Sequence, residues 1–357
     1  MTNAANDIPT LRFGNKIYPQ NLIEFGTPLS TGRVWFVDGD KSTGQAGATW
    51  EDAFSTIQAA INAASSGDVI YIAERTIPVV NGSLGSVGTD PISYDEHLTI
   101  PNSKSSLSLI GVSRGLTQGG LPQIKPTTTV TGDILQIKAA GCLIANLGFN
   151  GAGLTADTGA NGIELYDDGG LTASTFGTTI MGCHFKSLGR GHAGAAAAID
   201  APLGASWQLR IQDNRFHNCL VGIGFDTTST DRGQDIVITG NSFSSTVNTN
   251  VDCDIFLKGL AGGCEGIVID NNMFATVDVP THSGGASQRY LDLTGCEGIL
   301  SNNFFACKTG TEDTPVTFGA TTHTAGIVPA TVRMAGNYGE AAVGSKANGF
   351  GDIYRQD

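Results

Sequence analysis

The sequence predicts an all-β solenoid of stacked coils. Three observations support this fold class: a short repeated motif, a second repeated landmark, and a composition rich in glycine but poor in charge. The motif is Ile-x-x-Asn-x-Phe, and its clear and degraded copies occupy residues 144–149, 180–185, 211–216, 238–243, 269–274 and 300–305. The final phenylalanines are therefore 36, 31, 27, 31 and 31 residues apart. Self-similarity at such a period indicates stacked coils or the blades of a propeller.

Each copy of the motif predicts a strand, a corner and a second strand. Isoleucine and phenylalanine stand five positions apart, and a straight strand would place them on opposite faces. We expect a bend at the asparagine, which tolerates the left-handed backbone conformation that a sharp corner needs. Stacked corners would form a structural ladder of amides and rings from Asn214, Asn241, Asn272, Asn303, Phe216, Phe243, Phe274 and Phe305.

The second landmark is Gly-Cys-Glu-Gly-Ile, which occurs at 263–267 and again at 295–299. Ala140-Gly141-Cys142 is expected at the same place in an earlier coil. The seven cysteines show no metal-binding spacing. We therefore expect stacked, buried thiols, although neighbouring coils would also allow a disulfide between Cys264 and Cys296.

These repeats resemble the right-handed parallel β-helix of the pectate-lyase-like superfamily, most closely its phage virion and spike members, over about residues 34–340. The superfamily contains lyases, hydrolases, adhesins and viral spikes. The resemblance therefore implies a fold, whereas the function must be argued from a site. Viral relatives are usually trimers packed side by side, which implies a homotrimer.

Three segments are expected around the coils. Residues 1–33 lack the repeat and predict an extended N-terminal arm that docks on capsid or other virion proteins. The apolar residues expected to dock are Leu11, Phe13, Ile17, Tyr18 and Phe25. Residues 50–64 predict a helix with Thr49 as its N-cap, which would cover the open end of the solenoid. Residues 341–357 form a glycine-rich C-terminal tail.

The amino-acid composition limits the classes of partner that this protein can bind. Glycine contributes 49 of 357 residues and charged residues only 15%, which suits many tight corners. The net charge of −13 argues against nucleic acid and anionic membranes as partners. Residues 1–6 show no secretion signal, and no apolar run reaches transmembrane length. We expect a virion protein made in the host cytoplasm.

One stretch resembles a glycan-cleaving site. Asp167-Asp168, Gly191-His192-Ala193 and Arg210-Ile211-Gln212 follow the order of the Asp-Asp, Gly-His-Gly and Arg-Ile-Lys motifs of the polygalacturonase family. The preceding Asn-Thr-Asp motif is missing, and the third residues of the last two motifs differ. Asp167, Asp168 and His192 are therefore catalytic candidates only under an enzymatic interpretation. A polar turn before Gly169 explains the two aspartates equally.

Two further groups of carboxylates are candidates for chemistry. Asp252, Asp254 and Lys258 would suit a calcium-dependent lyase, but their alternation also fits a strand with one solvated face. Asp213 and Asp270 precede the corner asparagines and would lie roughly 10 Å apart, with corner capping as the other interpretation. The six histidines show no metal spacing, so neither a metal nor a cofactor is expected.

Two functions from different classes remain. The first is a non-enzymatic structural protein of a tailed-phage virion, either a capsid decoration (cement) protein or a short spike. It is favoured by the arm, the acidic charge and the lack of an intact catalytic motif. The alternative is a glycan depolymerase of tailspike type, either a polysaccharide lyase or a glycoside hydrolase, acting on a host surface glycan.

Overall fold

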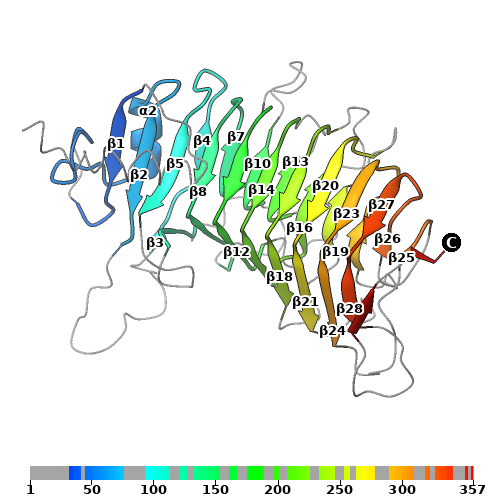
Figure 1. Cartoon of the computed structure of the whole chain (residues 1–357). Coiled ribbons are helices and arrows are strands. Elements are labelled where there is room, and N and C mark those ends of the chain that lie inside the picture. Colours follow the sequence, from blue (N-terminus) through cyan, green and yellow to red (C-terminus); the bar gives the residue numbers. More distant parts are fainter. Residues whose placement is uncertain are drawn as a thin grey trace, which may run out of the picture.

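The computed structural model describes residues 32–41, 45–75, 93–112, 121–126, 132–152, 161–166, 175–188, 197–201, 207–225, 233–245, 253–257, 263–277, 289–308, 318–321, 326–340, 350–352 and 355–356. These residues form three sheets of ten strands each, and the strands of every sheet follow one another along the axis of the solenoid (Figure 1). Each regular coil contributes one strand to every sheet. The predicted parallel β-helix is confirmed.

The sheets are named here in the order in which a coil meets them. The first sheet contains β1 (Val34–Val37), β2 (Val69–Ala73), β5 (Ser108–Val112), β8 (Leu143–Ala145), β11 (Thr179–Met181), β14 (Arg210–Gln212), β17 (Val237–Thr239), β20 (Ile267–Asp270), β23 (Gly298–Ser301) and β27 (Val332–Ala335). The second contains β3 (Ser93–Tyr94), β6 (Gln123–Ile124), β9 (Gly148–Asn150), β12 (His184–Lys186), β15 (Arg215–His217), β18 (Ser242–Ser245), β21 (Met273–Val277), β24 (Phe304–Lys308), β28 (Tyr338–Glu340) and β29 (Phe350–Asp352). The third contains β4 (Leu98–Ile100), β7 (Leu135–Ile137), β10 (Ile163–Leu165), β13 (Ile199–Ala201), β16 (Val221–Phe225), β19 (Cys253–Leu257), β22 (Arg289–Asp292), β26 (Gly326–Ile327), β25 (Phe318–Gly319) and β30 (Arg355–Gln356).

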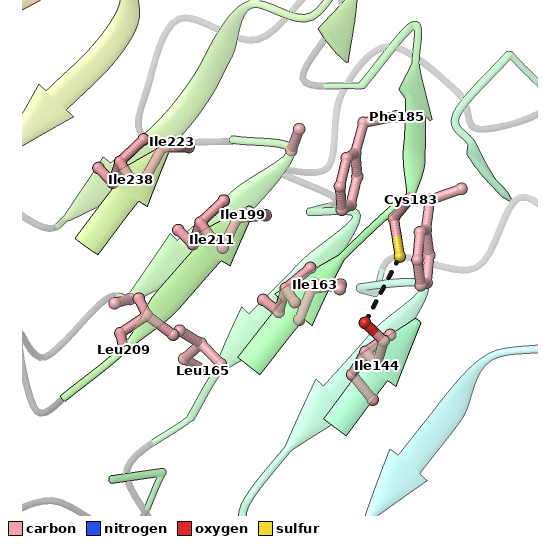
Figure 2. Close-up of a cluster of buried hydrophobic side chains, with 14 of the residues drawn as sticks. Ile144, Ile163, Leu165, Cys183, Phe185, Ile199, Leu209, Ile211, Ile223 and Ile238 are labelled. Carbon is pink, nitrogen blue, oxygen red and sulfur yellow. Dashed lines mark hydrogen bonds between the residues drawn. The ribbon is translucent and has the colours of Figure 1, made fainter. Parts of the chain in front are cut away.

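Register places like residues on like residues. Ile211 of β14 pairs with its counterparts at 180 and 238 in the neighbouring strands of the first sheet. Phe216 of β15 likewise pairs with Phe185 and Phe243 in the second sheet. These side chains point inward and form one continuous core, part of which Figure 2 shows around Ile163 and Ile199. The core is a stack of identical layers because the motif repeats at equivalent positions.

The phenylalanines of the motif form one buried stack. Successive rings from Phe149 to Phe305 are separated by 5.1, 5.0, 4.6, 4.9 and 4.6 Å between centroids, with interplanar angles of 9° or less. The members of this stack are Phe149, Phe185, Phe216, Phe243, Phe274 and Phe305. The spacing matches the distance between neighbouring strands, so ring stacking and backbone pairing reinforce each other.

The corner asparagines also form a buried column, but they do not make the bend. The left-handed residue is the one before each asparagine: Asp213 has φ 54° and Gly240 has φ 69°. Asn271 and Asn302, each with φ 54°, occupy the same position in later coils. The ladder asparagines instead link the coils with their amides. The expected role of asparagine in the bend therefore passes to its predecessor, which explains why that position holds Asp, Gly or Asn.

The helix at the N-terminal end, α2 (Ile57–Ala63), is shorter than the predicted 50–64 segment. Thr56, not Thr49, is its N-cap, and the Thr56 hydroxyl accepts a hydrogen bond from the Ala59 amide. Glu96, from the coil beside it, accepts hydrogen bonds from the first two helical amides at 2.8 and 2.9 Å. Thr49 caps only a turn, because its hydroxyl accepts from the Asp52 amide.

Two other expected features can be placed. The six cysteines whose side chains are described are buried and form no disulfide, so the structure does not join Cys264 to Cys296. Cys142 is not their equivalent, because strand register aligns it with Ile267, three residues beyond Cys264. Figure 2 shows Cys183 inside the core, where its Sγ lies 3.7 Å from the Ile144 carbonyl oxygen.

The structure describes parts of the predicted C-terminal tail but not the predicted N-terminal docking residues. The arm residues Leu11, Phe13, Ile17, Tyr18 and Phe25 lie outside the described residues. In the tail, β29 runs antiparallel to β28, and β30 pairs with β25. No helix in the described ranges is long and apolar enough to cross a membrane.

The outer face of the first sheet is apolar near its N-terminal end. Val69, Ile110, Leu143 and Ala145 form a second, smaller buried cluster there, with Tyr71 and Met181 packed against it. The outer faces of the second and third sheets each carry a group of titratable side chains.

Candidate active site

The third sheet carries a column of polar side chains on its outer face. In three consecutive coils the middle residue of the strand is polar while its neighbours point into the core: Gln136 in β7, Glu164 in β10 and Asp200 in β13. Strand register aligns these three residues directly. Neighbouring strands are about 4.8 Å apart, so the side chains are adjacent.

Two amides tie this column to a third carboxylate, Asp133, which precedes β7. The Gln136 side-chain amide donates to Asp133 Oδ2 at 3.0 Å and to Glu164 Oε2 at 2.9 Å. Asn161 donates its backbone N–H to Asp133 Oδ1 at 2.9 Å and its side-chain amide to Asp200 Oδ2 at 3.3 Å. The Asn161 side-chain oxygen accepts from the Ala197 amide at 2.8 Å, which fixes its orientation. The three carboxyl groups are therefore held together by a network rather than crowded by chance.

This grouping changes the acidity of Glu164. Partial burial raises the pKa of Glu164 to about 9, and a hydrogen bond with Asp133 and the charges of Asp133 and Asp200 act in the same direction. The hydrogen bond from Gln136 opposes the shift. Like charges this close cannot all ionise, so one carboxyl retains its proton. Glu164 is therefore the protonated member of the group near neutral pH.

The arrangement suits acid–base chemistry. A protonated carboxylic acid can donate to a leaving group while a neighbouring ionised carboxylate acts as base or nucleophile. No three His, Cys, Asp or Glu side chains converge as metal ligands would, within the part of the chain that the structure describes.

The network continues toward the stretch selected from the sequence. Tyr166 follows Glu164 on the same outer face, and Lys138 Nζ lies 4.3 Å from the centre of its ring. Asp167 and Asp168 come directly afterwards, but they lie outside the described residues, as does His192. Glu164 therefore precedes Asp167 by three residues, whereas Asp133 and Asp200 belong to the two neighbouring coils.

The other carboxylates of the sequence analysis are not brought together. Asp252 and Lys258 lie outside the described residues, and Asp254 is buried in β19. Asp213 is a left-handed corner residue, whereas Asp270 belongs to β20 and accepts hydrogen bonds from Ser301 Oγ at 2.7 Å and Asn302 Nδ2 at 2.9 Å. Strand register aligns Asp270 with Thr239, not with a corner residue. The two aspartates are therefore not an equivalent pair, and both serve the corners.

Sequence reasoning missed Asp133, Gln136, Asn161, Glu164 and Asp200. A signal was present, because 135–137, 163–165 and 199–201 each hold a polar residue between two apolar ones. That pattern predicts an outward side chain on a strand. Intervals of 28 and 36 residues between the three polar positions hid their alignment.

Comparison with known proteins supports the fold. No family model and no curated protein matches this chain. Among solved structures, it is similar to alginate lyase from Paenibacillus sp. str. FPU-7, with 15% identity, 84% of this chain and 95% of that chain covered, and a TM-score of 0.52. It also aligns with the pectin methylesterase PemA from Erwinia chrysanthemi, with 15% identity, coverage of 92% and 94% respectively, and a TM-score of 0.38. At 15% identity, the likeness to the alginate lyase supports the parallel β-helix fold.

Proposed function

We propose that this protein cleaves glycans by acid–base catalysis, as a depolymerase of the glycoside hydrolase type. The main support is the network of three carboxyl groups on the third sheet, those of Asp133, Glu164 and Asp200. The amides of Gln136 and Asn161 hold these groups in place. Glu164 acts as the general acid. Asp133, the half-buried carboxylate joined to Glu164 through the Gln136 amide, acts as the base or nucleophile, and the buried Asp200 adds negative charge beside Glu164.

The scaffold is compatible with this chemistry. The alginate lyase of similar fold is named for cleavage of a polysaccharide, so a parallel β-helix can carry such a site. A regular outer sheet face also offers a long surface to an extended polymer, with one coil every 4.8 Å or so. A hydrolase is favoured over a lyase because the grouped side chains are carboxylates rather than a strong base beside a cation.

Glu164→Gln is expected to reduce glycan cleavage at least about a hundredfold, because the amide keeps the shape of the acid but cannot donate its proton. The measurement is release of reducing ends from a panel of neutral and acidic polysaccharides, with unsaturated-uronate absorbance read in parallel. Glu297→Gln is the matched control, since this exposed carboxylate lies far along the solenoid and should be neutral. Equal activity of wild type and Glu164→Gln would contradict the proposal, and unsaturated products would assign a lyase instead.

The stability of the protein should depend on pH through Glu164. Its folded-state pKa is raised to about 9, whereas the unfolded value is about 4.3. The neutral acid is favoured by folding, so its contribution is complete below pH 4.3 and is lost as pH rises toward 9. We expect urea unfolding of the wild type and of Glu164→Gln, each at pH 5 and pH 8, to show that the variant gains stability relative to the wild type at the higher pH. An unchanged difference would argue against a protonated Glu164.

A structural role in a tailed-phage virion, as a decoration protein or short spike, is the second candidate. The continuous phenylalanine stack and the asparagine column favour it, because both make a rigid shaft. In that role the chain would be a homotrimer docked through residues 1–33. The same polysaccharide panel separates the two functions, since a purely structural protein would cleave none of its members.

A further inference from the structure

The outer face of the second sheet carries a compact group of basic side chains. His184 and Lys186 point outward from β12, and Arg215 and His217 point outward from β15. Strand register places His184 beside Arg215 and Lys186 beside His217. The four side chains, called here the basic quartet, therefore form a rectangle about one strand spacing wide. Such a group is notable in a chain with only 20 Lys and Arg residues and a net charge of −13.

The two permanent charges of the quartet face no acidic neighbour on their sheet. The aligned outward positions on either side are Gly148 and Asn150 in β9, and Ser242 and Ser244 in β18. Neither Lys186 nor Arg215 forms an ion pair with any carboxylate in the described ranges. Arg215 is exposed and Lys186 half-buried. Within the part of the chain that the structure describes, the positive charge and N–H donors of the quartet therefore face no carboxylate.

Both histidines favour the neutral form, and two contacts orient the His217 ring. Ser244 Oγ lies 3.1 Å from His217 Nδ1, and the Asn218 side-chain amide donates to His217 Nε2 at 3.2 Å. Burial lowers the pKa of His184 to about 4, and the nearby charge of Arg215 acts in the same direction. Burial lowers the pKa of His217 as well. An anion beside these rings would face two full charges and additional polar groups.

The same outward column becomes apolar farther along the solenoid. Beyond Arg215 and Ser242, strand register continues through Met273, Phe304 and Tyr338. Met273 is 44% exposed and Tyr338 is 51% exposed. Arg215 and Tyr338 are four strand steps apart, or roughly 19 Å. The faces of the Phe304 and Tyr338 rings can pack against the apolar face of a sugar ring, and the Tyr338 hydroxyl adds a hydrogen-bonding group.

We propose that the outer face of the second sheet binds an extended acidic oligosaccharide, with a carboxylate or sulfate of the ligand in the basic quartet and a sugar ring on Phe304 and Tyr338. Charge complementarity selects this ligand. Two cations suit a polymer with widely spaced acidic groups, whereas nucleic acid carries a charge every few ångströms and would be repelled by the net charge of −13. The surface lies on a different sheet from Glu164, so the inference does not require Glu164 to be the catalytic acid.

The test is calorimetric titration of the Glu164→Gln protein, which prevents turnover of the ligand. The ligands are a 1,4-linked uronic acid hexasaccharide, a sulfated neutral hexasaccharide, the carboxyl-reduced hexasaccharide and a dC hexamer. Lys186→Gln with Arg215→Gln should weaken binding of the preferred acidic hexasaccharide at least tenfold. Tyr338→Ala should weaken it several-fold and should affect the carboxyl-reduced ligand equally.

Arg210→Gln is the matched control. Arg210 is an exposed arginine of the same coil but lies on the first sheet, so its removal changes net charge without touching the surface. Equal weakening by Arg210→Gln, no binding of either acidic hexasaccharide, or tighter binding of the dC hexamer would each overturn the inference. Preference for the uronic acid or the sulfated ligand identifies the acidic group. Binding without cleavage by the wild type would remove the proposed hydrolase function and leave this surface intact.

Discussion

Replacing Asn241 with alanine is expected to lower the free energy of unfolding by about 4 kcal/mol. The Asn241 side-chain oxygen accepts from the backbone and side-chain amides of Asn214, at 2.9 and 3.0 Å. Its own amide donates to the Ile211 carbonyl at 2.9 Å. Alanine leaves the buried Asn214 backbone N–H and Ile211 carbonyl without this partner, and the Asn214 side-chain amide keeps only its hydrogen bond to the Ile180 carbonyl. Each lost partner costs about 1–3 kcal/mol. The Asn241 amide also donates to Asn272 Oδ1 at 3.0 Å, so one side chain connects three successive coils.

Urea unfolding monitored by circular dichroism measures this effect. Ser242→Ala is the control, because Ser242 is the next residue along the chain but lies on the outer face of β18. That substitution should change stability by no more than about 0.5 kcal/mol. If Asn241→Ala cost less than about 1 kcal/mol, the asparagine column would not be a stabilising ladder.

Phe243→Ala is expected to cost about 4 kcal/mol, within the range for emptying a buried phenylalanine site. The Phe243 ring lies in the middle of the stack, 4.6 Å from the Phe216 ring and 4.9 Å from the Phe274 ring between centroids. Its removal leaves both neighbours without a stacking partner on one side. Rigid backbone pairing of β18 with β15 and β21 limits collapse around the cavity.

Phe176→Ala provides the comparison for this substitution, because Phe176 is 43% exposed and belongs to no stack. It should cost less than about 1 kcal/mol in the same urea experiment. Phe243→Leu should fall between the two, since it keeps most of the apolar volume but loses the ring contacts. Similar losses for Phe176→Ala and Phe243→Ala would show that the stack contributes no more than ordinary burial.

The core of this fold could be predicted from sequence because three positions of the motif are nearly constant. Ile211, Asn214 and Phe216 have close counterparts in neighbouring coils, and each side chain has one fixed environment. The sequence pattern predicts the left-handed corner at the constant asparagine, one residue too late. The residue that makes the corner varies from coil to coil, as Asp213, Gly240 and Asn271 show. A backbone conformation that several residue types can adopt is harder to recognise in a sequence than a position that always holds a buried ring.

The candidate site was harder to predict for a related reason. Glu164 and Asp200 are aligned by strand pairing, yet loops of unequal length separate them in the sequence. Motif resemblance drew attention to Asp167 and Asp168, which follow the same strand. The helix start was misplaced in a similar way: Thr49 and Thr56 both carry N-cap hydroxyls, and Glu96 from another coil supplies the additional acceptor that favours the second. Tertiary contacts settled each case.

The residues at the left-handed corners limit which coils can lie next to one another. At Gly240 a Cβ atom would overlap the Asp213 side chain of the preceding coil, and at Gly182 it would meet Asn146 in the same manner. A large and an absent side chain therefore face each other at these two interfaces. Asn271 and Asn302 hold the same position in consecutive coils, so two amide-sized corners can also be neighbours. A coil inserted next to Asp213 or Asn146 would therefore need a glycine at its own corner, whereas a coil inserted next to Asn271 could carry an asparagine there.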